Sequence, residues 1–213
     1  MERLRNEIIV TKEEILKFKT KLIMPELVKI KNDTIRDFTI LALEKAPNGL
    51  WLDPCSSSGR WHPPQDQVIP GGIINHLICC QYMIEQAIQR YPDFIKDDQR
   101  IKLDKLRCVG WLHDIAKCGI PWGKKTVPNH GYLGVIWLEE MEGIKNNYYL
   151  FQEIIEGIYW HMAHWEQDYR TGQKFTDFQK IIQEADYYST RAKLRFADIT
   201  LINFPHYKEI RIN

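Results

Sequence analysis

Three observations in the sequence predict a single all-α domain. Apolar residues recur at the three- and four-residue spacing of amphipathic helices through most of the 213 residues. No series of strand–helix–strand units appears, and no internal repeat, low-complexity tract or linker divides the chain. A chain of this length can bury one substantial core. We therefore expect one helical bundle over residues 1–213, ending in a short hairpin or an irregular tail over 193–213.

The composition narrows the class of protein. Hydrophobic residues make up 44% and charged residues 27%, and the net charge is +1 with acids and bases interspersed. We therefore expect neither extended nucleic acid nor a membrane as a partner, and the oligomeric state stays open. The five cysteines include no CxxC pair, which indicates reduced thiols. Cys79, Cys80 and Cys108 are expected to be buried as small hydrophobes. The N-terminus lacks the apolar segment of a signal peptide, so we expect a soluble, cytoplasmic protein.

Two helices are expected over residues 11–46. Apolar residues recur at helical spacing from Ile15 up to Pro25, which should break or restart the helix. Residues 27–43 form the second pattern, which ends before the turn residues 46–49.

Residues 49–71 are expected to form a loop on the substrate side of a site. Glycine, proline and serine crowd into this stretch, and its tryptophans favour ordered packing over disorder. Loops carry binding and catalytic groups more often than other elements do. His62 is therefore a candidate site residue, with a surface histidine as the alternative.

The helices expected within residues 72–192 carry most of the histidines. Helical patterns cover 72–90, 99–117, 129–141, 148–165 and 175–192. His76 lies on the first turns of the first, and His113 and Asp114 lie close to the C-terminal end of the second. Asn129 is placed to cap the third, which bears His130 on its first turn.

A histidine and an aspartate at the end of an apolar helix point to a metal site. Burying His113 and Asp114 is costly without a partner, and imidazole and carboxylate are both good ligands of divalent cations. An isolated His-Asp pair is more often a helix cap or a satisfied core histidine. Here, however, six of the seven histidines fall within residues 62–164, at intervals that place them on successive antiparallel helices. The ends of such helices can meet in one bundle core.

The order of these residues resembles the H…HD…D signature of the HD-domain metal-dependent phosphohydrolase superfamily. The matching positions are His76, His113-Asp114 and Asp186. Three flanking segments are also similar to that superfamily: the GG-containing helix start at 70–76, the HDxxK segment at 113–117 and the A-D-x-x-x-x-R helix at 184–191. The resemblance covers about residues 50–195, and the missing GYP element argues against the cyclic-di-GMP phosphodiesterase branch.

The resemblance implies a ligand set for one divalent ion. The four ligands would be His76, His113, Asp114 and Asp186, and the candidate ions are Mn, Mg, Ni, Co, Zn and Fe. The ion would polarise the phosphoryl group and activate a water molecule. Asp114, Lys117 and His62 would be the catalytic residues, with Lys117 placing its charge on the phosphate unless it is a solvated helix end. Arg191 is a further candidate for the phosphate, or a surface salt bridge.

Further histidines extend this candidate site. His130 and His161 correspond in order to histidines that many HD proteins use for a second ion, with Asp114 bridging, or for substrate phosphate. His164 shares a helix face with His161 and is the alternative, with His161 preferred because it follows the apolar run directly. One ion and two ions both stay open. Four tryptophans near the predicted site edges are more often core residues than platforms for a base: Trp51, Trp61, Trp122 and Trp165.

The sequence therefore predicts a phosphomonoesterase or phosphodiesterase that acts on a nucleotide or another small phosphate ester. One alternative is an HD-fold oxygenase with two irons, which uses the same H…HD…H…H…D order of ligands. The other is a non-catalytic nucleotide-binding module, although a degenerate site would be expected to have lost one of the four core ligands.

Overall fold

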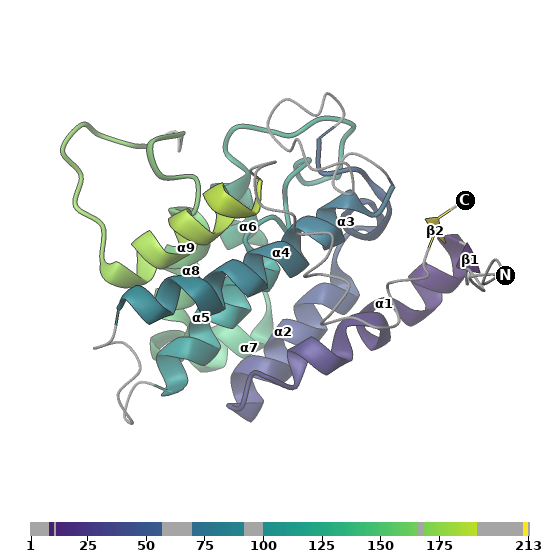
Figure 1. The fold of residues 1–213 in the computed structure, drawn as a ribbon, viewed down its shortest axis with the longest axis horizontal. Coiled ribbons are helices and arrows are strands. Elements are labelled where there is room, and N and C mark those ends of the chain that lie inside the picture. Colours follow the sequence, from purple (N-terminus) through teal and green to yellow (C-terminus); the bar gives the residue numbers. More distant parts are fainter. Residues whose placement is uncertain are drawn as a thin grey trace, which may run out of the picture.

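The computed structural model describes residues 9–10, 12–56, 70–91, 100–165, 168–190 and 211–212, which form a helical bundle (Figure 1). The predicted all-α fold is confirmed. In chain order the elements are β1 (Ile9–Val10), α1 (Lys12–Leu27), α2 (Asp33–Lys45), α3 (Asn48–Leu52), α4 (Gly72–Ala87), η2 (Ile88–Arg90), α5 (Arg100–Leu112), α6 (His130–Glu139), α7 (Glu142–Asn146), α8 (Tyr148–Tyr159), η5 (Ala163–Trp165), α9 (Asp177–Ser189) and β2 (Arg211–Ile212).

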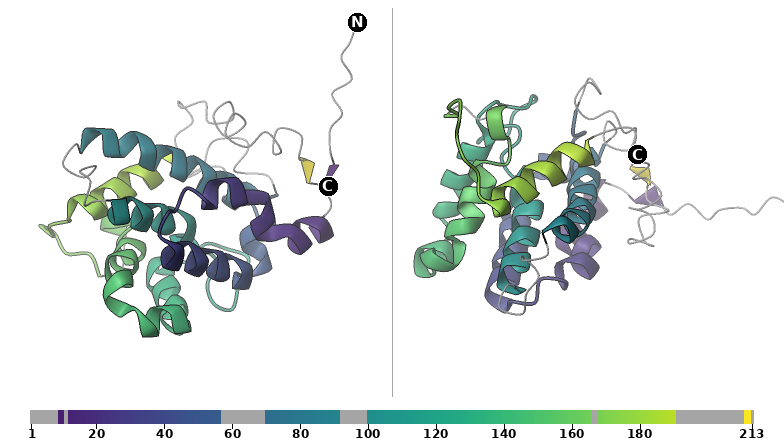
Figure 2. Two further views of the ribbon diagram at one scale, coloured as in Figure 1. Left: turned by 90° about the horizontal axis from the view of Figure 1, so that it is seen from below. Right: turned by 60° about the vertical axis from the view of Figure 1, so that its left-hand side comes forward.

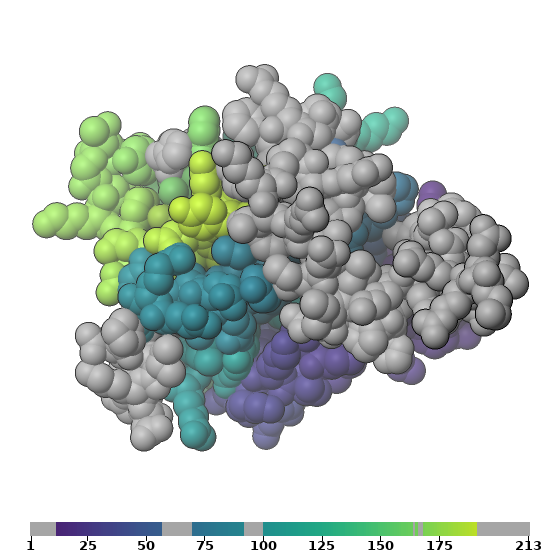
Figure 3. Space-filling view, viewed as in Figure 1, coloured from purple at the N-terminus to yellow at the C-terminus, as the bar shows by residue number. Residues whose placement is uncertain are grey.

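The helices that surround the centre of the bundle are α4, α5, α8 and α9. α4 packs against α9 and α5, and α4 and α9 lie side by side on the face shown in Figure 3. α8 packs against α5 and α9, and α6 packs against α8. α1 and α2 cover the other end of the bundle, far from the segment that joins α8 to α9 (Figure 2). Apolar side chains from all these helices form one buried cluster.

The prediction that Pro25 breaks the first helix was wrong. Pro25 lies inside α1, and the backbone leaves helical geometry instead at Phe18, with φ −115° and ψ 16°. The residues near Pro25 are held by burial, because Ile23 and Leu27 are fully buried on either side of it. Tertiary packing therefore outweighs the local preference of proline in this helix.

The start of α2 depends on a contact that local sequence cannot reveal. The Asp104 carboxylate accepts hydrogen bonds from the backbone N–H groups of Lys31 at 3.0 Å and Asn32 at 2.7 Å. The Asn32 side chain in turn caps α2 by accepting from the N–H of Ile35 at 3.0 Å. The helix predicted from residue 27 therefore begins only at Asp33.

Residues 49–71 are not loop throughout, because α3 occupies Asn48–Leu52. Trp122 packs against α3 at Gly49, and its indole N–H donates to the Asp53 carboxylate at 2.9 Å. This contact joins α3 to the segment that follows α5. Residues 57–69 lie outside the described residues, and the predictions for His62 and Trp61 fall there.

Replacing Gly49 with alanine should break this contact. A Cβ at residue 49 would lie 1.9 Å from Nε1 of Trp122, so the indole must move away from Asp53. We expect Gly49→Ala to lower the free energy of unfolding by about 1–3 kcal/mol in urea denaturation. Gly134→Ala is the control, because its Cβ would meet no atom closer than 3.4 Å. Equal stability of the two variants would contradict this explanation.

Three helices that carry candidate ligands end or begin differently from the prediction. α5 ends at Leu112, so His113 and Asp114 open the turn segment that follows it. α8 ends at Tyr159, so His161 lies in a turn and the helix face proposed for His161 and His164 does not exist. α6 covers His130–Glu139, with Asn129 at the predicted N-cap position, although the Asn129 side chain makes no capping hydrogen bond.

The two short strands lie beside the start of α1 (Figure 1). Ile9 pairs with Arg211 and Val10 with Ile212 in parallel. β2 therefore pairs with the N-terminal strand, and the rest of the predicted tail lies outside the described residues. Within the described ranges, no helix is both long and apolar enough to cross a bilayer.

Candidate metal centre

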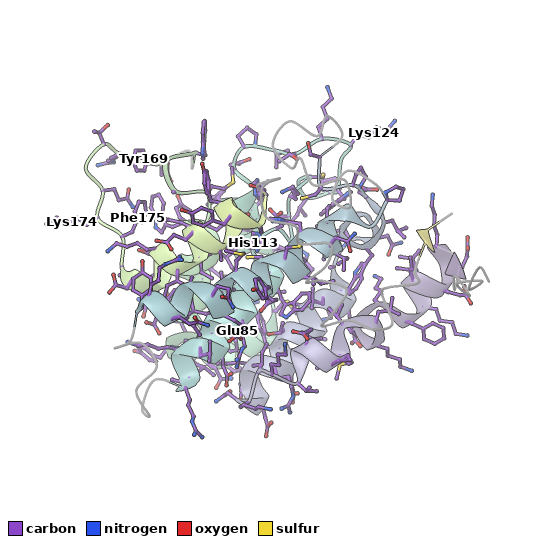
Figure 4. The ribbon with its side chains drawn as sticks, in the orientation of Figure 1. Glu85, His113, Lys124, Tyr169, Lys174 and Phe175 are labelled. Atoms are coloured by element: carbon purple, nitrogen blue, oxygen red, sulfur yellow. The ribbon has the colours of Figure 1, made fainter. Side chains whose placement is uncertain are left out.

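Six side chains with ligand atoms converge where the inner helices meet. They are His76 from α4, His113 and Asp114 directly after α5, His130 at the start of α6, His161 just after α8, and Asp186 from α9. The four histidines and Asp114 are at most 2% exposed. Figure 4 shows His113 at the middle of the bundle, whereas Lys124 lies on an outer loop. The helix ends therefore bring together residues that are up to 110 positions apart in the chain.

The first group of donors is formed by His76, His113 and Asp186. The Nε2 atoms of His76 and His113 are 3.1 Å apart. Oδ1 of Asp186 lies 3.1 Å from Nε2 of His76 and 3.6 Å from Nε2 of His113. Oδ2 of Asp114 completes this group, at 3.4 Å from Nε2 of His76.

The second group is formed by Asp114, His130 and His161. Oδ1 of Asp114, the oxygen that does not face His76, lies 3.1 Å from Nε2 of His130 and 3.8 Å from Nε2 of His161. The two Nε2 atoms are 3.0 Å apart. Asp114 therefore presents one carboxylate oxygen to each group.

Three of the four imidazoles are oriented by backbone carbonyls three residues earlier. The Nδ1 atoms of His113, His130 and His161 lie 3.1, 2.7 and 2.7 Å from the carbonyl oxygens of Gly110, Val127 and Ile158, respectively. Gly110 and Ile158 lie in the last turns of α5 and α8, where carbonyls have no partner within the helix. A carbonyl only accepts hydrogen bonds, so each Nδ1 carries the proton and each Nε2 presents a lone pair.

The fourth imidazole, His76, is oriented by Ser189 of α9. The Ser189 hydroxyl donates to the backbone carbonyl of Asp186 at 2.7 Å, so its oxygen accepts from Nδ1–H of His76 at 3.0 Å. Nε2 of His76 therefore also presents a lone pair to the first group. The sequence analysis gave Ser189 no role, and its serine within the A-D-x-x-x-x-R segment was the only signal available.

These donor groups fit divalent cations. Lone pairs that face one another at 3.0 and 3.1 Å repel unless a positive charge lies between them. Ligands bonded to one ion at ~2.1 Å lie about 3 Å apart when they are adjacent in its coordination shell. Neutral imidazoles with protonated Nδ1 and hydrogen-bonded carboxylates are the ligand forms that metal sites require.

The Lys117 ammonium neutralises part of the negative charge of the Asp114 carboxylate. It is 5% exposed, and its ammonium donates to Oδ2 of Asp114 at 2.6 Å. Burial acts to lower the pKa of Lys117, but the Asp114 carboxylate outweighs burial and the pKa is raised. The solvated helix end considered for Lys117 is therefore wrong. Cys55 lies beside it, with its sulfur and the ligand atoms of His76 and Asp114 all within 4.8 Å of one another.

The two carboxylates keep their charge despite burial. Burial alone would raise the pKa of Asp114, but Lys117 and the neighbouring imidazoles hold it well below its usual value. Burial would likewise raise the pKa of Asp186, but the neighbouring His113 and His76 hold the pKa of this carboxyl well below its usual value. For His113, burial acts to lower the pKa, but the carboxylates raise it overall. In the metal-free protein, a proton bound by an imidazole can thus supply the positive charge that a metal ion would otherwise supply to the carboxylates.

Removing the Ser189 hydroxyl should weaken metal binding through His76. Ser189→Ala removes the hydroxyl that accepts from Nδ1 of His76, so the orientation and the tautomer of the imidazole are held less firmly. We expect the metal affinity to fall about 10–100-fold in a competition assay with a chelator dye. Thr190→Val is the matched control, because the Thr190 hydroxyl donates to the Tyr187 carbonyl. Equal metal affinity of the two variants would show that Ser189 does not act through His76.

His161 should make the metal-free protein sensitive to acid. Burial, followed by the neighbouring His130 and His113, lowers the pKa of His161 from 6.5 to about 3. Between these values the unfolded chain binds a proton that the folded chain rejects. The contribution of His161 to stability is therefore complete above about pH 6.5 and is lost on acidification toward pH 3.

The test compares urea unfolding of metal-free wild type and His161→Gln from pH 7 to pH 4. We expect the free energy of unfolding to fall less steeply with acidification in the variant, because glutamine does not titrate. Parallel pH profiles for the two proteins would contradict the lowered pKa of His161.

Several predicted site residues lie outside this description. His62 and Arg191 are not among the described residues, and neither is the side chain of His164. Of the tryptophans considered, Trp51 is a core residue at 1% exposure and Trp122 is bonded to Asp53. Trp165 is different, because it is 60% exposed.

A cavity of about 460 Å³ opens directly beside the donor groups. Its inner end contains Asp114, Lys117, His130, His161 and Asp186. Its walls come from the segment after α3, the loop before α6, the turn after α8 and one face of α9. The remaining lining residues are Cys55, Ser56, Thr126, Val127, Pro128, Met162, Ala163, Trp165, Gln183, Tyr187 and Thr190. A small ligand can therefore reach the candidate metal centre.

Comparison with known proteins gives one family. The family model described as HD domain matches residues 73–191, which is more than half of the chain. The matched range contains all six of the converging side chains. No curated protein and no solved structure showed significant similarity to the chain.

Proposed function

Because the chain belongs to the HD-domain family, we propose that it is a phosphohydrolase that holds two divalent ions and cleaves a small phosphate ester. The observation that carries the proposal is the position of Asp114. Its two oxygens face two separate histidine groups, as expected for a carboxylate that bridges two ions. In this proposal His76, His113 and Asp186 hold one ion with Asp114, and His130 and His161 hold the other.

Bound ions of this kind polarise a phosphoryl group and supply a nucleophile from water near neutral pH. The protein holds the ligand side chains in the orientations that this chemistry requires. Nδ1 contacts fix all four imidazoles with their lone pairs inward. Lys117 holds the bridging carboxylate in place through Oδ2. Since Lys117 also lines the cavity, we propose that its charge attracts the phosphate.

The charges of the site favour an anionic substrate. Two divalent ions and the Lys117 ammonium exceed the charge of the carboxylates of Asp114 and Asp186, and the histidines in their ligand form are neutral. The excess is positive and buried, where charge interactions are stronger than in water. His62 and Arg191 remain proposed contacts to the phosphate.

The test is a substrate screen with defined metals. The purified protein, freed of metal with a chelator, is reconstituted separately with Mn, Mg, Co, Ni, Zn and Fe. Each preparation is assayed against nucleoside monophosphates, cyclic nucleotides and generic phosphomonoesters and diesters. We expect ester cleavage with at least one metal and none with the chelator. Failure of every metal-loaded preparation to cleave any ester would overturn the proposal.

The same screen separates the two alternatives. The six donors can also hold two irons, and an oxygenase would consume oxygen only in the iron-loaded preparation. A non-catalytic module would form a tight nucleotide complex with metal bound and no turnover over hours.

A further inference from the structure

A sulfur donor lies beside the histidine and carboxylate donors of the metal centre. Cys55 follows α3 and is 2% exposed, and its Sγ atom and the ligand atoms of His76 and Asp114 all lie within 4.8 Å of one another. Two ligands on opposite sides of one ion, at ~2.3 Å for sulfur and ~2.1 Å for nitrogen, lie about 4.4 Å apart. The three donor atoms therefore lie within about the diameter of one coordination shell.

The backbone beside Cys55 is held by the same elements that hold the ligands. The Asp53 carbonyl accepts a hydrogen bond from the N–H of Ile73 at 3.3 Å, in the first turn of the helix that carries His76. The Asp53 carboxylate accepts from the indole N–H of Trp122 at 2.9 Å, in the segment that follows α5. The position of the sulfur atom therefore follows from the packing of α3 against α4 and against the segment after α5, and it does not depend on a bound ion.

The surroundings of this sulfur are suited to a thiolate that is bound to a cation. Burial raises the pKa of the Cys55 thiol, and the Lys117 ammonium beside it acts in the opposite direction. A cysteine binds a metal ion as the thiolate, so the S–H proton leaves as the sulfur–metal bond forms, and no electron is transferred. Cys55 lines the cavity, which gives that proton a route to the solvent.

The other thiols near the centre are placed differently. Cys80 lies one turn after His76 on α4, where burial, followed by the Asp186 carboxylate, raises its pKa. Cys118 lies in the turn segment after α5. Among the residues that the structure describes, neither of these two cysteines belongs to a group of converging donors, and neither lines the cavity. Proximity to the centre alone therefore does not distinguish Cys55, whereas its place among the donor atoms does.

We propose that the Cys55 thiolate is an additional ligand of the ion held by the first group of donors, and that it makes this position selective for zinc, cobalt or ferrous ions over magnesium and manganese. The ligands implied by the family resemblance are histidines and aspartates, and a thiolate is a softer donor than either. Its negative charge leaves the loaded centre positive, so an anionic substrate is still favoured. The inference rests on the proposed function only for the metal centre, and not for the reaction.

The experiment detects the sulfur–metal bond without relying on turnover. A thiolate bound to Co²⁺ gives an intense charge-transfer band in the near ultraviolet, which imidazole and carboxylate ligands do not give. The metal-free protein is titrated with Co²⁺ while its absorption spectrum is recorded. We expect the band in wild type and in the matched controls Cys80→Ser and Cys118→Ser, and its loss in Cys55→Ser. A wild-type spectrum without the band, or a band that persists in Cys55→Ser, would overturn the thiolate ligand.

The metal preference is a second measurement on the same proteins. Competition with a chelator dye gives the Kd values for Mn²⁺ and Zn²⁺, and their ratio reports the selectivity of the centre. We expect the ratio of the Mn²⁺ value to the Zn²⁺ value to fall about 10-fold or more in Cys55→Ser, because loss even of a group that only orients a ligand costs that much affinity. Equal ratios in wild type and Cys55→Ser would contradict the selectivity.

A measurement on wild type alone applies if Cys55→Ser does not fold. X-ray absorption of the zinc-loaded protein should show a sulfur neighbour at ~2.3 Å from the metal. A coordination shell of nitrogen and oxygen only would overturn the proposal.

The two proposals fail in different ways. A charge-transfer band that depends on Cys55, without cleavage of any ester, supports the thiolate ligand and contradicts the phosphohydrolase. Ester cleavage by a zinc-loaded or cobalt-loaded protein with no sulfur bound to the metal supports the phosphohydrolase and contradicts the thiolate ligand.

Discussion

Asp114→Asn is expected to remove both ions and abolish ester cleavage. Among the residues that the structure describes, Asp114 is the carboxylate whose two oxygens face the two groups of donors. Loss of the electrostatic stabilisation that the ions supply should lower kcat/KM by about 10³-fold or more. Elemental analysis and phosphate release on the same preparation give the measurement. Asp37→Asn is the control, because the Asp37 side chain is 72% exposed on α2.

This substitution also leaves Lys117 buried without its carboxylate. Removing one partner of a buried ion pair costs about 3–5 kcal/mol of stability, so the single variant can unfold. The double variant Asp114→Asn, Lys117→Met removes both charges and should fold with a stability close to that of the metal-free wild type. It should still bind no ions. A folded double variant that retains two ions and activity would contradict the role given to Asp114.

His130→Gln is expected to remove one ion and leave the other. His130 contacts Oδ1 of Asp114 and His161, whereas His76, His113 and Asp186 form the first group without it. The metal content should fall from two ions per chain to one, and kcat/KM should fall about 100-fold or more if both ions act on the phosphate. Elemental analysis after gel filtration measures the content.

The matched variant is His76→Gln, which should deplete the first group instead. Together the two variants test whether the groups are separate sites. Retention of two ions in His130→Gln, or loss of both ions in each variant, would contradict this division.

The helices could be predicted from the sequence because their packing makes apolar residues recur at a fixed spacing. α4, α5, α8 and α9 each bury one apolar face, and that face recurs every three to four residues. The candidate ligands were recognisable for a related reason. A histidine within an apolar helical pattern stands out against its neighbours, as the buried His76 does on α4.

Contacts between distant residues could not be predicted. The delayed start of α2 depends on Asp104, which is 72 residues from Asn32, and the position of Trp122 depends on Gly49 and Asp53. The end of α5 was also misplaced, because His113 and Asp114 continue a helical pattern in sequence but turn away from it in the structure. The carboxylates of Asp104 and Asp53 decide the first two features. The orientation of His113 depends on the Gly110 carbonyl, and backbone carbonyls are the same at every residue.

Ser189 and Tyr187 illustrate the same limit within the site. Both follow Asp186 within three residues, and nothing in their residue types separates the one that orients His76 from the one that lines the cavity. Their roles follow from the face of α9 on which each lies. That face is set by the packing of α9 against α4 and α8.

Titration of the metal-free protein with Mn²⁺, followed by electron paramagnetic resonance, tests the central claim most directly. Two ions bridged by Asp114 should be magnetically coupled, so the spectrum at two ions per chain should be that of a coupled pair. The same titration of His130→Gln should show only isolated Mn²⁺. A wild-type spectrum of isolated Mn²⁺ at every loading, or a content that saturates below two ions per chain, would contradict the bridged pair.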